Sequence, residues 1–202
     1  MIRAFLAVEL SQELQAELAI VQQELKRIIE PEMKRDTRIS WARPASIHLT
    51  IKFLGDMDEQ VIDPLLVAVE RAMEGQTAMN VPLERLGAFP RPYNPRVLWV
   101  GPSENWEQGA EAKRIGEIHG TTEQACEGLR FLREGKPFSP HLTLARIKMG
   151  ERHVGAALAK AGVLDRPLSL GWLAVESVVL MKSELRPTGS VYTKQWEVKL
   201  GE

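Results

Sequence analysis

Apolar and polar positions follow two different periodicities along the chain, and their succession predicts a series of strands and helices. Residues 2–10 are almost continuously apolar, which is typical of a buried strand. Ser11 then stands in the position of an N-cap, and large aliphatic side chains recur at helical spacing from there to about Ile29. Pro31 marks the end of this segment. The chain is therefore predicted to begin with one strand and one amphipathic helix.

The same patterns predict the rest of the chain as an antiparallel α+β arrangement. A helix through residues 61–72 is expected to start at Asp56 or at Asp63, and further helices are expected over about 105–126 and 154–161. Strands are expected over residues 38–42, 47–54, 81–86, 97–100, 141–147, 168–173, 175–180 and 192–199. Many of these strands alternate apolar with polar positions and several are joined by short turns, which favours an antiparallel sheet over parallel βαβ units.

Two short segments in opposite halves of the chain match each other. One reads Ile47-His-Leu-Thr-Ile-Lys-Phe53 and the other Pro140-His-Leu-Thr-Leu-Ala-Arg146. Each segment lies near the middle of one half of the chain. The repeat therefore predicts a duplicated unit, with two lobes related by a pseudo-twofold axis within a single domain of residues 1–202.

Strand geometry gives the repeated triplet a chemical meaning. Side chains two positions apart in a strand share a face, so His48 lies beside Thr50 and His141 beside Thr143. The leucines and isoleucines between them face the core. If the two lobes meet about the pseudo-twofold axis, both His/Thr faces line one cleft.

Two imidazoles and two hydroxyls in one cleft suit phosphoester chemistry. Imidazole titrates near neutral pH, so one histidine can act as general base for the attacking oxygen and the other as general acid for the leaving oxygen. The threonine hydroxyls can donate hydrogen bonds to the nonbridging oxygens. A zinc site is the alternative reading, but two histidines without a nearby carboxylate or third ligand make a poor one, so no metal and no cofactor are predicted.

Composition narrows the classes of partner. The formal net charge is -1, whereas proteins that wrap a long nucleic acid usually carry a basic excess. A nucleotide or a nucleic-acid end remains compatible, because it has few phosphates to neutralise. The single cysteine, Cys126, excludes an internal disulfide and fits a cytoplasmic location. The N-terminal segment does not resemble a signal peptide, and no apolar run is long enough to span a membrane.

Beyond the triplets, the sequence resembles the two-histidine phosphoesterase superfamily, and within it the RNA 2′,3′-cyclic phosphodiesterases, historically called 2′-5′ RNA ligases. The resemblance rests on five segments that span nearly the whole chain: Arg3-Ala-Phe-Leu-Ala-Val, His48-Leu-Thr-Ile-Lys-Phe-Leu-Gly, Phe89-Pro through Pro95-Arg-Val-Leu-Trp-Val-Gly101, Phe138-Ser-Pro-His-Leu-Thr-Leu-Ala-Arg146 and Leu185-Arg-Pro-Thr-Gly-Ser-Val-Tyr192.

The resemblance implies a bilobal fold with two antiparallel sheets flanking a central cleft and helices on the outside. It also implies metal-independent hydrolysis of an RNA-terminal 2′,3′-cyclic phosphate to a 2′-phosphate, with a reverse, ATP-independent 2′-5′ ligation. By the same resemblance His48 is the proton donor and His141 the proton acceptor, while Thr50, Thr143 and Arg146 bind phosphate. The expected partner is an RNA end or a nucleotide with a cyclic phosphate, bound by a monomer.

Several alternatives stay open at this stage. Phe53 is implied to contact a base or sugar, yet strict alternation places it with the core residues. Arg146 would likewise point away from Thr143 unless a bulge redirects it. The pseudo-symmetry leaves open which histidine is the acid. The substrate can instead be a small nucleoside or ADP-ribose cyclic phosphate, and a nucleotide-binding module without catalysis is a third possibility.

Overall fold

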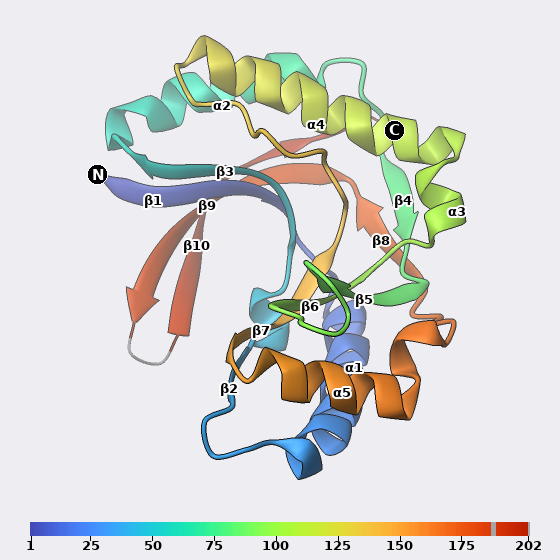
Figure 1. Cartoon of the computed structure of the whole chain (residues 1–202). Helices are drawn as coiled ribbons and strands as arrows, with labels where there is room; N and C mark the ends of the chain where they lie inside the picture. The colour runs from blue at the N-terminus through green and yellow to red at the C-terminus, as the bar shows by residue number, and fades with distance from the viewer. Residues whose placement is uncertain (187–188, 202) are drawn as a thin grey trace.

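The structure is a computed structural model that describes residues 1–186 and 189–201. It is an α+β fold in which helices cover the outside of an antiparallel sheet (Figure 1). The strands are β1 (Ile2–Val8), β2 (Arg38–Trp41), β3 (Leu49–Met57), β4 (Met79–Pro82), β5 (Arg85–Phe89), β6 (Val97–Gly101), β7 (Leu142–Met149), β8 (Trp172–Val175), β9 (Ser177–Arg186) and β10 (Gly189–Lys199). The α-helices are α1 (Gln12–Ile29), α2 (Ile62–Met73), α3 (Glu104–Glu107), α4 (Ala110–Gly128) and α5 (Glu151–Ala161).

The sheet consists of two four-stranded halves, each of which carries one His-x-Thr triplet. The first half has the order β10-β9-β1-β3, and the second contains β7, β6 and β5 with β2 paired to the free side of β7. The halves meet at one residue pair, Leu49 with Leu142, the residues that follow the two histidines. Strands β4 and β8 form a separate two-stranded ladder. The predicted antiparallel two-lobed architecture is thus confirmed, and the two lobes share a continuous sheet.

Helices pack on both lobes in the way that their apolar faces predict. Ser11 caps α1 as expected, since its Oγ accepts a hydrogen bond from Leu14 N at 3.2 Å. The buried stripe of α1 includes Leu14, Leu18 and Leu25. Helix α1 lies beside α5 at one lobe, while α2 and α4 run together over the other (Figure 1). None of the helices within the described ranges combines the length and apolarity needed to cross a membrane.

Several predicted boundaries were wrong. The expected strand 81–86 is split into β4, which pairs with β8, and β5, which pairs with β6. Leu83 and Glu84 connect the two strands. The expected helix 105–126 is likewise divided, into α3 and α4. Strand β8 begins only at Trp172. Helix α2 follows a 3₁₀ turn capped by the Asp58 carboxylate, and begins at neither of the two expected positions. Pro187 and Thr188, within the segment 185–192, lie outside the described residues.

Candidate active site

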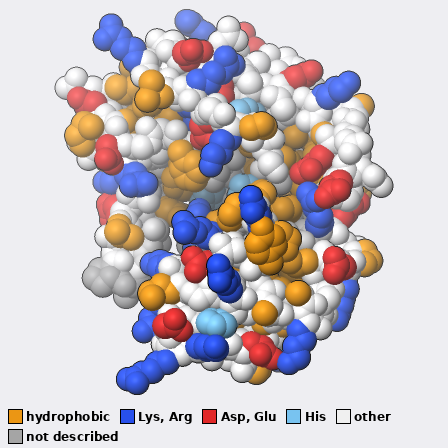
Figure 2. All heavy atoms as spheres, in the orientation of Figure 1, with side chains coloured by type: hydrophobic (Ala, Val, Ile, Leu, Met, Phe, Trp, Pro, Cys, Tyr) orange, Lys and Arg blue, Asp and Glu red, His pale blue; other side chains and the backbone are white. Residues whose placement is uncertain are grey.

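Residues of both lobes line a cavity of about 570 Å³. Figure 2 shows the molecule hollowed near the middle of one face, with hydrophobic and basic side chains around the hollow. Five of the six predicted site residues line this cavity: His48, Thr50, Phe53, Thr143 and Arg146. The sixth, His141, lies close enough that its charge lowers the pKa of His48. The six residues that the sequence predicted for the site therefore lie in or beside one cavity in the structure.

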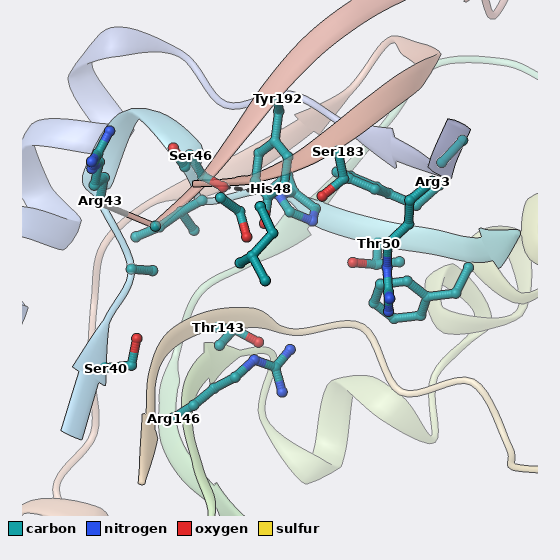
Figure 3. A pocket seen from close by; sticks show the side chains of 18 of the residues that line it. Arg3, Ser40, Arg43, Ser46, His48, Thr50, Thr143, Arg146, Ser183 and Tyr192 are labelled. Atoms are coloured by element: carbon teal, nitrogen blue, oxygen red, sulfur yellow. Dashed lines mark hydrogen bonds between the residues drawn. The ribbon is translucent and has the colours of Figure 1, made fainter. Parts of the chain in front are cut away.

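His48 stands one residue before β3 and two residues after the 3₁₀ turn Pro44–Ser46. Its Nδ1 lies 2.9 Å from the backbone oxygen of Ser46 (Figure 3). A carbonyl oxygen only accepts hydrogen bonds, so Nδ1 carries the proton in the neutral ring and Nε2 keeps the free lone pair. The ring stacks on Phe5, with centroids 4.5 Å apart, and Tyr192 meets it edge-on at 5.3 Å.

His141 repeats this arrangement in the other lobe. It stands one residue before β7, and its Nδ1 lies 2.8 Å from the backbone oxygen of Ser139, again two residues upstream. The ring makes a T-shaped contact with Phe89, with centroids 5.1 Å apart, and the centroid of Trp99 lies 6.1 Å away. Gly87 makes room for that indole, because any Cβ there would overlap the Trp99 ring. Both imidazoles thus have the same tautomer and a fixed plane.

The pKa values of both histidines lie below the usual value for imidazole. Burial is the main cause for His48, and the positive charges of Arg146 and His141 lower the pKa further, while the hydrogen bond to Ser46 opposes the shift. For His141 burial again leads, with Arg146 adding to it and the hydrogen bond to Ser139 opposing it. In the free protein the two rings are therefore mostly neutral near pH 7, each with an acceptor nitrogen. A bound anion would favour protonation.

Two β-bulges decide which way Phe53 and Arg146 point. In β3, Thr50 pairs with Ala7 and Lys52 with Leu6, so Ile51 has no partner in β1 and alternation shifts by one residue. Phe53 consequently faces the cavity, with 55% of its surface exposed. The alternative that placed Phe53 in the core was wrong.

The second bulge lies at the equivalent position of β7. Thr143 pairs with Trp99 and Ala145 with Leu98, which leaves Leu144 without a partner in β6. Arg146 is thereby returned to the face of Thr143 and lines the cavity opposite His48 and Thr50 (Figure 3). Strict alternation had allowed Arg146 to reach the phosphate only if a bulge redirected it, and the structure contains that bulge. The two bulged residues, Ile51 and Leu144, each stand three positions after a histidine.

The cavity also contains residues that the sequence patterns alone did not assign. Arg3, Phe5 and Tyr192 line it from β1 and β10. The segments around Arg3 and Tyr192 belong to those that carry the family resemblance, which was the available signal. None of the described residues that line the cavity is acidic, so its charged lining is wholly cationic.

A buried ion pair lies behind the site and was not predicted. Lys52 is fully buried, and its Nζ lies 2.8 Å from the carboxylate of Glu123 on α4. The same Nζ donates to the backbone oxygen of Leu132 at 2.9 Å. Glu134 in turn accepts from Phe53 N at 3.2 Å. Through these contacts β3, which follows His48, is held against the segment 132–134, which precedes His141.

The described residues contain no group of three or more His, Cys, Asp or Glu side chains arranged to hold a metal ion. The cavity offers the imidazole of His48, the hydroxyls of Thr50 and Thr143 and several guanidinium groups, and the imidazole of His141 lies close to it. This set can transfer protons and hold an anion.

Comparison with known proteins agrees with this chemistry. The chain is 31% identical over 192 residues to the RNA 2′,3′-cyclic phosphodiesterase of Methanothermobacter thermautotrophicus, and the match covers 95% of each chain. The enzyme of the same name from Aeropyrum pernix is 34% identical over 154 residues, which cover 76% of this chain and 82% of that one.

Solved structures share the whole fold. A protein from Thermus thermophilus superposes with a TM-score of 0.71 at 29% identity, over 99% of both chains. Escherichia coli LigT in complex with 3′-AMP superposes with a TM-score of 0.72 at 21% identity, over 100% of this chain and 99% of that one. The sequence pattern described as LigT like Phosphoesterase matches residues 8–99 and 108–192. The chain therefore belongs to the LigT-like phosphoesterase family.

Proposed function

We propose that the protein hydrolyses a 2′,3′-cyclic phosphate at an RNA end to a 2′-phosphate, with His48 and His141 as the proton-transfer groups. The observation that carries this proposal is the matched pair of imidazoles, each with Nδ1 held by a backbone carbonyl and Nε2 left free. The lining of the cavity is cationic and has no acidic side chain among the described residues, which supports an anionic substrate. The relatives named RNA 2′,3′-cyclic phosphodiesterase support the choice of ester.

In the proposed reaction His141 takes a proton from water through its free Nε2 as the water oxygen attacks phosphorus. Protonated His48 gives its Nε2 proton to O3′ as the P–O3′ bond breaks, which leaves a 3′-hydroxyl and a 2′-phosphate. Solvent exchange then restores both rings. The substrate anion counteracts the low pKa of His48, because negative charge beside an imidazole favours its protonated form.

The remaining site residues have binding roles in this proposal. The hydroxyls of Thr50 and Thr143 and the guanidinium of Arg146 donate hydrogen bonds to the nonbridging oxygens, where charge must be held as water attacks. Phe53 offers an exposed ring against which a base or sugar can pack. No metal ion is assigned a step, so activity should survive dialysis against a chelator.

The test is an RNA oligonucleotide that ends in a 2′,3′-cyclic phosphate, with identification of the product. The expected product is the 2′-phosphate, and replacing either His48 or His141 by Ala should lower kcat/KM by about 10²–10⁴-fold or more. Circular dichroism and thermal unfolding of the variants provide the control for folding. Near-wild-type turnover by a folded single variant would contradict the two-histidine mechanism.

The same site permits a smaller substrate or the reverse reaction. A nucleoside or ADP-ribose cyclic phosphate presents the same reacting group, and a 5′-hydroxyl RNA end in place of water would give a 2′-5′ linkage. Binding without turnover would instead indicate a nucleotide-binding module, but both triplets are intact. We further propose that the chain is one two-lobed domain that acts as a cytoplasmic monomer. The single, buried cysteine is consistent with a reducing compartment.

A further inference from the structure

The cavity carries more positive charge than one cyclic phosphate requires. Three arginines line it, and no described lining residue offers a carboxylate. A 2′,3′-cyclic phosphate has a single negative charge, and Arg146 with the two threonines suffices to hold it. Arg43 already interacts with other groups in the chain. Arg3 is therefore the cation that has no role in the proposed reaction at the cyclic phosphate.

Arg3 lies on a different lobe from Arg146 and is available for a ligand. It is exposed on β1, and the alternation of that strand places it on the same face as Phe5, which covers His48. In the sheet it stands between Asp56 of β3 and Ser183 of β9. Across the part of the chain that the structure describes, Arg3 forms no ion pair, even with Asp56.

The close view of the cavity places this arginine beside the reacting groups. Figure 3 shows the side chain of Arg3 extending from β1 past Thr50, while Arg146 reaches into the cavity from the other lobe. Phe53 lies next to this path, because it pairs with Phe5, two residues from Arg3. A nucleoside packed against the Phe53 ring would thus have a guanidinium at its edge, in addition to the guanidinium at the cyclic phosphate.

We propose that Arg3 binds a second phosphate, the phosphodiester on the 5′ side of the terminal nucleotide, and so selects polynucleotide ends over nucleoside cyclic phosphates. This inference rests on the proposed function of the site. A guanidinium suits the role, because it donates two parallel hydrogen bonds to phosphate oxygens and stays charged at every working pH. Arg3 is then a specificity residue, since the bond to be broken lies one nucleotide away.

The experiment compares three substrates that share one reacting group. The first is a nucleoside 2′,3′-cyclic phosphate, with no other phosphate. The second is a dinucleotide with a 2′,3′-cyclic phosphate end, and the third is the same dinucleotide with a neutral methylphosphonate linkage. Each is assayed with the wild type, with Arg3→Gln and with Arg27→Gln, which removes the same charge from a position of α1 outside the cavity.

The wild type is expected to prefer the charged dinucleotide. Arg3→Gln should lower kcat/KM for that substrate by about tenfold or more, mainly through KM, because a hydrogen bond to a charged group is lost. The same variant should change the mononucleotide rate by less than about twofold, which also shows that the variant is folded. It should no longer distinguish the phosphodiester from the methylphosphonate. Arg27→Gln should behave as the wild type with all three substrates.

The possible failures are distinguishable. If the wild type hydrolyses none of the substrates, the proposed function is wrong. If it hydrolyses them but Arg3→Gln loses activity equally on all three, Arg3 serves the reacting phosphate and the selective role is overturned. An unchanged preference for the charged dinucleotide in Arg3→Gln would also overturn it. Partial recovery of the preference in Arg3→Lys would support recognition of charge.

Discussion

The ring of Phe5 stacks on the imidazole of His48, with centroids 4.5 Å apart and planes inclined by 25°. Phe5 is itself almost fully buried, so its ring removes one face of the imidazole from water. Burial is the main cause of the low pKa of His48. Strand β1 thus contributes to the protonation state of His48, which stands just before another strand, β3.

Replacing Phe5 by Ala should therefore raise the pKa of His48 toward its usual value of 6.5. Water reaches the ring in the variant and stabilises its charged form. An NMR titration of the imidazole resonances measures this shift, and His141 is the internal control, since its ring contacts are Phe89 and Trp99. An unchanged or lower pKa at His48 in a folded variant would show that the stacked ring is not a source of the burial effect.

Arg146 should act on both histidines at once. Its positive charge lowers the pKa of His48 and of His141, so Arg146→Gln should raise both values in the free protein. The pH profile of kcat/KM reports the free enzyme, and both of its limbs should move to higher pH in this variant. Arg27→Gln again controls for a general loss of charge. A shift of both limbs to lower pH would contradict the assigned electrostatics.

Because Lys52 and Glu123 form a buried ion pair, removing the lysine alone should greatly lower the stability, and removing both charges should restore part of it. Lys52→Met leaves the Glu123 carboxylate, 2% exposed, without its cation. An unpaired buried charge costs about 3–5 kcal/mol, and this loss should lower the midpoint of urea denaturation. The double variant Lys52→Met, Glu123→Leu should regain much of the loss, because no unpaired charge remains.

A surface pair provides the control for that experiment. Lys160 and Glu32 also form a close contact, at 2.6 Å, but both side chains are exposed, so Lys160→Met should leave the midpoint nearly unchanged. Equal stability of Lys52→Met and the double variant would show that another group compensates the charge of Glu123. His119, with Nε2 3.8 Å from that carboxylate, is the group that would provide this compensation.

The repeated triplet was sufficient to predict that His48, Thr50 and Thr143 face one cavity, because period-2 alternation is local and both copies obey it as far as Thr50 and Thr143. Beyond them alternation fails at Ile51 and Leu144. Each bulge is defined by a missing partner on a neighbouring strand, and a single strand's sequence does not contain that partner. Phe53 and Arg146 could therefore be placed on the cavity face by resemblance but not by pattern.

Long-range pairing explains the other differences. The break between β4 and β5 arises because Val81 pairs with β8 whereas Leu86 pairs with β6, and no local signal separates the two ladders. The buried Lys52 could not be recognised for a similar reason. Its partner Glu123 is distant in the sequence, and a lone lysine in a strand is usually solvated.

The assignment of acid and base to the two histidines can be tested with a better leaving group. If His48 protonates O3′, a cyclic phosphate with sulfur in place of O3′ should need less help from an acid, because a thiol has a pKa of about 8.5 and leaves as the thiolate. The sulfur substrate should then rescue His48→Ala more than His141→Ala, since attack by water still needs a base. Single-turnover rates for both substrates and both variants provide the comparison. Equal rescue, or rescue of His141→Ala alone, would reject the assignment. A 3′-phosphate from the all-oxygen substrate would show that the other ester bond breaks, while the two-histidine chemistry would remain.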